Sequence, residues 1–171
     1  MLITSSEAVE KVFGNKLIMF LGVTLPFPAI NRRLWFIFES RFFNIRENPN
    51  PTGYDHIIIG GSIRGAATSK ELQDYIKTNK GLLKRKIRGL FAVCGNRGRP
   101  AGQQQATMYI DNHLAKLCEV SNVSSKVFPG RITKSLMDSQ TARMMERMED
   151  YDNLKRVDCM AFGQEILAGM K

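Results

Sequence analysis

A hydroxyl and a guanidinium follow a short apolar run in the first half of the chain. The run is Ile57–Ile59, and two glycines, Ser62 and Arg64 come soon after it. Consecutive β-branched residues without polar alternation are typical of a parallel strand that is covered on both faces. Ligands of open α/β sheets bind outside the carboxyl ends of such strands. The pattern therefore predicts either a ligand site at the end of a buried strand or a tight turn that only needs glycines, since one glycine-rich turn is a weak motif.

The same pattern occurs a second time further along the chain. Leu90–Val93 is another apolar run, and Cys94, Gly95 and Asn96 open a polar, glycine-rich loop directly after it. Glycines let a ligand approach the backbone closely, and an Asn side chain both donates and accepts hydrogen bonds. Two such loops at the ends of neighbouring strands are a stronger signal of a binding site than either loop alone.

No set of side chains with catalytic or metal-binding spacing accompanies these loops. His56 and His113 are the only histidines, and we interpret both as structural or surface residues. Cys94, Cys118 and Cys159 are odd in number and widely spaced, which favours neither a disulfide framework nor a zinc site. We therefore predict no metal site, no catalytic acid or base, and a reducing, cytoplasmic environment.

Positive charge is concentrated near the middle of the chain. The formal net charge is +9, and a cluster of this kind can attract nucleic acid, anionic lipid or an acidic protein. The cluster also falls where a helix is expected to end, and cations there interact favourably with the helix dipole. No aromatic residues interleave with it, so a stacking platform for single strands is not supported and we expect no nucleic-acid partner. Its members are Lys80, Lys84, Arg85, Lys86 and Arg88.

The elements that would position these loops alternate between strands and helices, which is typical of an α/β fold. The pattern begins at residue 42 and shows no internal repeat. Pro129 and Gly130 are expected to bend the last strand. Strands are predicted at residues 42–46, 57–60, 88–94 and 127–132.

Helices are predicted between these strands. Thr68 opens a capping-box pattern, which places a helix start there. Apolar residues that share one side predict a further helix over residues 104–117. Asp158 is expected to cap a last helix whose Phe162 and Ile166 face the sheet.

The segment NPNPTGYDHIIIGGSIRGA, residues 48–66, resembles a segment of the flavodoxin-like FMN-binding family. It is most similar to the short branch that includes the menaquinone-dependent protoporphyrinogen dehydrogenases, and the resemblance covers residues 42–168. It implies a flavodoxin-like three-layer α/β sandwich with a five-stranded parallel sheet, with 1–171 as one domain and 1–41 as a divergent segment. It also implies FMN as cofactor, with the isoalloxazine ring in contact with Gly61, Ser62, Ile63, Arg64, Gly65, Cys94, Gly95 and Asn96.

The N-terminal segment departs from the family pattern. A Ser/Thr- and Gly-rich loop would follow the first strand and bind the FMN phosphate through backbone amides, and no such loop is evident. In one register the first strand is a stub ending at Thr4, so that Thr4, Ser5 and Ser6 would be the phosphate donors. In another register Lys16–Val23 is the strand, and the loop after it contains two prolines, which lack an amide hydrogen. The sequence leaves both registers open.

The resemblance implies an FMN-binding redox protein that transfers electrons. The alternatives are a protoporphyrinogen dehydrogenase-type flavoenzyme and a noncatalytic interaction domain that has lost FMN, so enzymatic activity is left open. A redox protein, a quinone or a porphyrin would be the partner. The charged, Met-rich segment Ser135–Leu154 is interpreted as helix packing or as a peripheral contact with the inner face of a membrane. No transmembrane segment is expected, because the apolar stretch Leu17–Ile30 is short and contains prolines.

Overall fold

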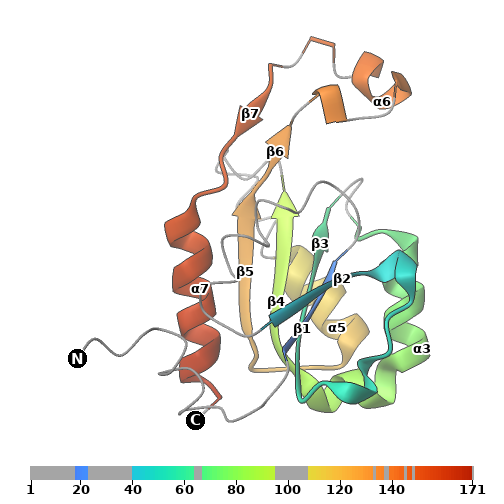
Figure 1. Cartoon of the computed structure of the whole chain (residues 1–171), viewed down its shortest axis with the longest axis vertical. Helices are drawn as coiled ribbons and strands as arrows, with labels where there is room; N and C mark the ends of the chain where they lie inside the picture. The colour runs from blue at the N-terminus through green and yellow to red at the C-terminus, as the bar shows by residue number, and fades with distance from the viewer. Residues whose placement is uncertain are drawn as a thin grey trace.

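The central sheet has five parallel strands, as the sequence predicts (Figure 1). The computed structural model describes residues 18–22, 40–63, 67–94, 108–132, 134–136, 139–144, 146–147 and 149–170. Within these residues the strand order is β2-β1-β3-β4-β5, and each neighbouring pair is parallel. The strands are β1 Ile18–Gly22, β2 Ser40–Asn44, β3 His56–Ser62, β4 Ile87–Cys94 and β5 Ser124–Pro129.

Helices cover both faces of the sheet and complete three layers, which confirms the predicted fold class. In Figure 1, α3 and α5 lie on one face and α7 lies on the other. The isoleucines of β3 alternate between these layers. Ile57 and Ile59 pack with the residues of α3, whereas Ile58 packs with the residues of α7. The helical elements are η1 Ile45–Glu47, η2 Pro51–Gly53, α3 Lys70–Lys86, the π-helical η4 Ile110–Leu114, α5 Ala115–Cys118 and α7 Arg156–Ala168.

Helix α3 starts one residue later than the capping pattern predicts. The Ser69 hydroxyl, rather than that of Thr68, accepts a hydrogen bond from the Leu72 amide at 3.3 Å. A side-chain oxygen at this position satisfies an amide that has no partner within the helix. The prediction was wrong at this residue because Glu71 lies three residues after Thr68 and completes the capping-box pattern there, whereas the residue three positions after Ser69 is Leu72.

The basic cluster lies at the C-terminal end of α3, as the charge pattern predicts. Lys80 and Lys84 contact the Glu119 carboxylate at 2.6 and 3.4 Å. Lys86 donates to the carbonyl oxygens of Pro51 and Thr52 at 3.3 and 2.9 Å. These cations therefore hold the end of the helix to neighbouring loops, in line with their interpretation as helix-terminal residues.

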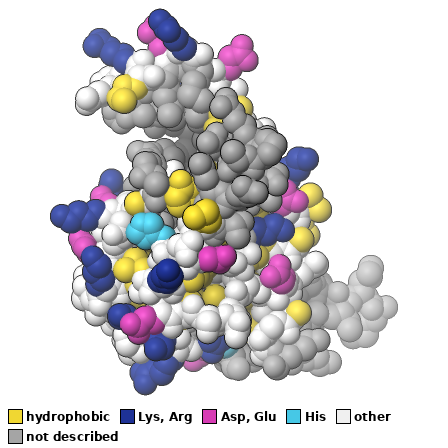
Figure 2. Space-filling model, turned by 180° about the vertical axis from the view of Figure 1, so that it is seen from behind, with side chains coloured by type: hydrophobic (Ala, Val, Ile, Leu, Met, Phe, Trp, Pro, Cys, Tyr) yellow, Lys and Arg dark blue, Asp and Glu magenta, His cyan; other side chains and the backbone are white. Residues whose placement is uncertain are grey.

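The predicted bent strand at residues 127–132 is two separate strands. After β5 ends at Pro129, β6 Arg131–Ile132 leaves the sheet and pairs antiparallel with β7 Tyr151–Asp152. We call residues 131–152 the arm. Its described parts also include η5 Lys134–Leu136 and α6 Ser139–Met144. The arm rises beyond the carboxyl ends of the sheet strands (Figure 1), and Figure 2 shows it as a lobe that carries both acidic and basic side chains.

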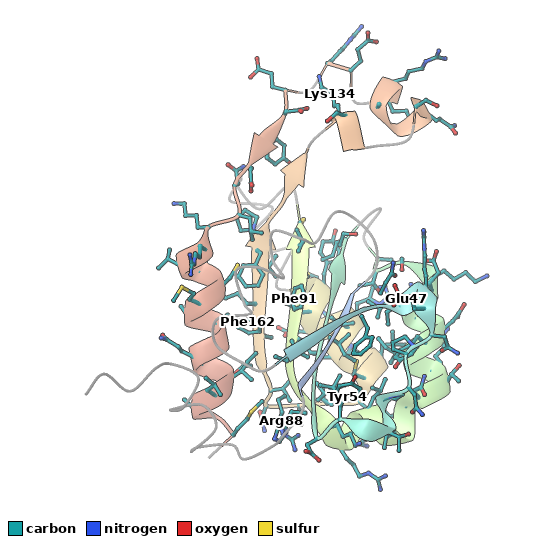
Figure 3. The ribbon with its side chains drawn as sticks, in the orientation of Figure 1. Glu47, Tyr54, Arg88, Phe91, Lys134 and Phe162 are labelled. Carbon is teal, nitrogen blue, oxygen red and sulfur yellow. The ribbon has the colours of Figure 1, made fainter. Side chains whose placement is uncertain are left out.

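The last helix packs through the predicted apolar residues but begins earlier than predicted. It starts at Arg156 after Lys155, so Asp158 lies in the first turn and is not the cap. Phe162 and Ile166 are buried against the sheet, as predicted. Phe128 contacts Phe91 and Phe162 edge to face, with ring centroids 6.0 and 5.7 Å apart, and Figure 3 shows the layer between the sheet and α7 where Phe91 and Phe162 lie.

The remaining expectations concern cysteines and membrane spans. All three cysteines are buried, and none forms a disulfide: Cys94, Cys118 and Cys159. Among the helices in the described ranges, none is both long enough and apolar enough to cross a bilayer. The described His, Cys, Asp and Glu side chains include no group that could hold a metal ion.

Candidate functional site at the carboxyl ends of the strands

The two loops singled out in the sequence start side by side. Ser62 pairs with Val93 in the register of β3 and β4, and the Ile63 amide donates to the Val93 carbonyl at 3.0 Å. Ser62, Ile63 and Cys94 therefore meet at one edge of the sheet. The strand order reverses between β1 and β3, and open α/β sheets bind ligands outside the carboxyl ends of their strands at such a point.

The two glycines before Ser62 serve packing within the protein. Both are buried within β3 instead of opening a loop. A Cβ atom at Gly60 would lie 2.2 Å from Cε1 and Cζ of Phe91, and one at Gly61 would lie 3.0 Å from Cδ2 of Leu72. The space beside each glycine is thus filled by a side chain of the core. This packing explains why both positions are glycine, and the predicted contact of Gly61 with the flavin stays a prediction.

Cys94 links the end of β4 to the base of the arm. Its carbonyl accepts a hydrogen bond from the Gly130 amide at 3.2 Å, and the Gly130 carbonyl accepts one from the Asn153 amide at 3.3 Å. Tyr151 lies two residues before Asn153 at the base of the arm, and burial, and next Cys94, raise the pKa of its phenol. Sequence reasoning missed these arm residues. The available signal was that Tyr151 is the only aromatic residue in the segment Ser135–Leu154.

A buried hydroxyl at this edge lacks a hydrogen-bond partner. Thr68 Oγ1 is buried, and no group in the described part of the chain bonds to it. Thr68 precedes α3 and lies behind Gly61, since its Cγ2 would be 4.0 Å from a Cβ atom there. Buried hydroxyls are almost always paired in folded proteins. This oxygen is therefore a polar group whose partner the described residues do not supply.

Seven of the predicted site residues lie outside the described part of the chain, and their roles stay predictions. The first strand, β1, ends at Gly22, in agreement with the second of the two registers proposed for the N-terminal segment. The residues that follow β1, from Val23 up to the start of β2, are also outside the described part of the chain. The seven residues are Thr4, Ser5, Ser6, Arg64, Gly65, Gly95 and Asn96.

The described end of the sheet has the chemistry that a flat heterocycle requires. Ser62 offers a half-buried hydroxyl, Ile63 an aliphatic side chain that is partly exposed, and Thr68 the buried oxygen without a partner. An isoalloxazine has apolar faces and a row of hydrogen-bonding atoms along one edge, so this donor set fits its ring. The phosphate end of such a cofactor would be bound by residues beyond those described.

A cavity lies at the opposite edge of the sheet. Its volume is about 690 Å³, and its lining includes His56, Arg88 and Ser124. His56 and Ser124 open β3 and β5, and Figure 3 shows Arg88 at the edge far from the arm. Of the predicted site residues that the structure describes, none lines this cavity, and it lies at the other end of the strands from Ser62 and Cys94.

Comparison with known proteins places these features in a family. Residues 39–155 match the model of a family described as flavodoxin domain. No curated protein sequence matches the chain. The fold is similar to that of oxidised Flavodoxin 1 from Bacillus cereus, at 16% identity and a TM-score of 0.57, over 92% of this chain and 100% of that one.

Two further solved structures share the fold. The apo form of an NADH:FMN oxidoreductase has 10% identity and a TM-score of 0.53, over 91% of this chain and 90% of that one. The Flv1 flavodiiron core from Synechocystis has 13% identity and a TM-score of 0.50, over 95% of this chain but only 38% of that longer one. These identities show likeness of fold alone. The family match, in contrast, covers more than half of the sequence, and the chain therefore belongs to the flavodoxin domain family.

Proposed function

We propose that this protein binds FMN noncovalently at the carboxyl ends of β3 and β4 and acts as an electron carrier. The observation that carries the proposal is the meeting of Ser62 and Ile63 with Cys94 at one edge of the sheet, in a chain of the flavodoxin domain family. When bound, the flavin supplies the redox chemistry, and the protein supplies binding, orientation and electrostatics.

Each described residue has a distinct part in this proposal. The Ser62 hydroxyl and backbone bind the hydrogen-bonding edge of the ring, and Ile63 covers part of an apolar face. The Ile63 amide already bonds to Val93, so its backbone contribution to the cofactor is its carbonyl. Thr68 holds a buried oxygen behind this loop. Outside the described residues, the sequence resemblance adds Arg64, Gly65, Gly95 and Asn96 to the ring contacts.

The test is flavin uptake by the purified chain. We expect a flavin absorbance spectrum, either as purified or after addition of FMN in excess. Ser62→Tyr places a large ring at the proposed site, and we expect it to weaken FMN binding by about tenfold or more, a change of at least about 1.4 kcal/mol. Ser124→Tyr is the matched control, because Ser124 lines the cavity at the opposite edge, where a ring has room.

Riboflavin separates the two ends of the cofactor, because it has the ring without the phosphate. Loss of riboflavin binding in Ser62→Tyr would place the effect on the ring. Equal affinity of the wild-type protein for FMN and riboflavin would mean that the phosphate contributes nothing. A wild-type protein that takes up neither compound contradicts the proposal and favours the noncatalytic interaction domain.

The proposal also concerns the partner that exchanges electrons with the flavin. The resemblance to the protoporphyrinogen dehydrogenase branch favours a porphyrin or a quinone, and a redox protein is the alternative expected for an electron carrier. Reduction of the FMN-loaded protein followed by stopped-flow mixing with menadione or with oxidised cytochrome c separates the two classes. Fast reoxidation by only the quinone supports the enzyme, and fast reoxidation by only the cytochrome supports the carrier.

A further inference from the structure

The side chain of Tyr151 is half-buried although it belongs to the arm. It pairs with Ile132 in the two-stranded ladder of β6 and β7. Side chains alternate between the two sides of a strand, and the next residue, Asp152, is exposed whereas Tyr151 is half-buried. The Asp152 carboxylate accepts from the Leu154 amide at 3.0 Å, which fixes the turn that returns the chain to α7.

The base of the arm is bonded to the end of β4. One hydrogen bond joins Gly130 to Cys94, and another joins Asn153 to Gly130. Leu154 is buried in the core cluster under α7, so the chain is held on both sides of the arm. Because these bonds are formed by backbone groups, the position of Tyr151 relative to Cys94 is set by the fold and does not depend on the arm's outer residues.

Tyr151 lies at the base of the arm, two residues before Asn153, whose bond to Gly130 joins it to the end of β4. Burial, and next Cys94, raise the pKa of its phenol, in agreement with this position. Cys94 is the last residue of β4 and adjoins Ser62 and Ile63 through the pairing of β3 and β4. A tyrosine has a flat apolar ring with one polar tip, and such rings pack against other aromatic systems at centroid distances of about 4.5–7 Å.

We propose that Tyr151 forms the arm-side wall of the flavin site, where its ring contacts the isoalloxazine and limits the exposure of the cofactor. The inference rests on the proposed binding of FMN. It adds an element that lies outside the two strand-end loops and assigns a role to the arm. The arm then holds an aromatic side chain over the cofactor, and a reactant must approach past it.

Nuclear magnetic resonance of the full chain tests the contact directly. The chain has four tyrosines, so protein labelled with ¹³C in the tyrosine rings gives four sets of signals. The set that is lost in Tyr151→Phe belongs to Tyr151. We expect FMN to shift the Tyr151 signals through the ring current of the flavin. Tyr54 serves as the control, because it packs edge to face against Phe43 with centroids 5.4 Å apart, near the start of β3.

Fluorescence of bound FMN gives a second measurement. A tyrosine in contact with a flavin quenches its emission by electron transfer, and a phenylalanine does not. Tyr151→Phe keeps the shape of the side chain, so we expect the protein to fold and the bound FMN to become at least twofold brighter, with Tyr54→Phe unchanged.

Three results are distinguishable. A saturating FMN titration with shifted Tyr151 signals and a brighter Tyr151→Phe complex supports the inference. Saturation of FMN binding with unmoved Tyr151 signals overturns the role of Tyr151 and leaves the proposed function intact. Absence of FMN uptake by the wild-type protein overturns both.

Discussion

Gly60→Ala tests whether the glycines before Ser62 are there for packing. The Cβ atom of the alanine would lie 2.2 Å from two carbons of the Phe91 ring, whereas carbon atoms in contact are normally about 3.5–4.0 Å apart. The ring is buried and is in edge-to-face contact with Phe128, so it has little room to move aside. The added methyl group therefore forces a shift in the sheet or in the aromatic layer under α7.

The size of the effect follows from two opposing contributions. Overpacking of a core costs about 1–3 kcal/mol, and this overlap is severe, so the upper half of that range applies. Replacing glycine in a strand recovers about 0.5–1 kcal/mol of backbone entropy. We therefore expect Gly60→Ala to lower the free energy of unfolding by about 2 kcal/mol, which lowers Tm by about 4–8 °C in a domain of this size.

Two other glycines calibrate the measurement. At Gly61 the alanine Cβ would lie 3.0 Å from Cδ2 of Leu72 and 4.0 Å from Cγ2 of Thr68, and the end of a leucine side chain can move slightly. We expect a loss below about 1 kcal/mol there. At Gly53 nothing lies within 4 Å of the added atom, and we expect a change within about 0.5 kcal/mol. Urea unfolding followed by circular dichroism gives all three values.

The cause of the Gly60→Ala effect can be isolated by a double-mutant cycle. Phe91→Leu removes the ring that the new methyl group would meet, so Gly60→Ala should cost much less in that background. We expect a coupling of about 1 kcal/mol or more between the two positions. A Gly60→Ala variant as stable as wild type, or an equal cost in both backgrounds, refutes the packing explanation.

Three further predictions concern titratable groups. The Tyr75 hydroxyl donates to the Pro49 carbonyl at 2.7 Å, so Tyr75→Phe should lose about 0.5–1.5 kcal/mol of unfolding free energy. Burial raises the pKa of Tyr75 to about 12 from 10.0. The unfolded chain therefore ionises first, and the wild-type protein loses stability between pH 10 and pH 12. A Tyr75→Phe variant that loses as much stability over this range in urea titrations contradicts this account. Burial also raises the pKa of the Cys118 thiol to about 12. Peptide mass spectrometry should find it unalkylated by iodoacetamide at pH 8 until urea unfolds the protein, and rapid labelling of the folded chain would count against that burial. The hydrogen bond from Lys80, with a further contribution from Lys84, lowers the pKa of Glu119. Because the pKa of Glu119 is lower in the folded state than in the unfolded state, Glu119→Gln should be less stable than wild type at pH 7. The difference in stability should vanish as the pH falls through the folded-state pKa of Glu119. Equal urea midpoints at pH 7 would be inconsistent with a stabilising ion pair between Glu119 and the lysines.

The buried strands could be predicted because their sequence signal is local. Ile57–Ile59 has no polar alternation, and a strand covered on both faces imposes that composition. The position of β1 was predicted only as one of two registers. Residues 16–23 are an apolar run like those of the other strands, but the loop expected after it has two prolines, so the run and the loop gave conflicting indications.

The role of the glycines could not be predicted, because it depends on a side chain of another strand. Gly60 lies beside Phe91 only through the register of β3 and β4, and a sequence read segment by segment contains no register. In the sequence, a glycine that leaves room for a ligand cannot be distinguished from a glycine that leaves room for a phenylalanine ring. The strand was therefore predicted to end at Gly60, whereas it continues for two more residues to Ser62.

The arm was missed for a related reason. β6 and β7 have two residues each, which is too short for any periodic pattern. Their pairing brings together residues that are far apart in sequence, Ile132 and Tyr151. The bend predicted at Gly130 lies where the chain leaves the central sheet and enters the arm. The π-helical turn Ile110–Leu114 was also missed, since its residues share the apolar spacing of an ordinary helix.

The two ends of the arm lie close together at its base, and this has a consequence for the evolution of the sequence. Because Gly130 and Asn153 are joined by a backbone hydrogen bond of 3.3 Å, the chain leaves the domain and returns to it at nearly one point. Doubling the length of a closed loop costs only about 0.6 kcal/mol. Insertions and deletions between these two residues leave β5 and α7 in place. A lineage can therefore lengthen, shorten or exchange this segment, and an engineer can graft another one there, while the sheet is inherited unchanged.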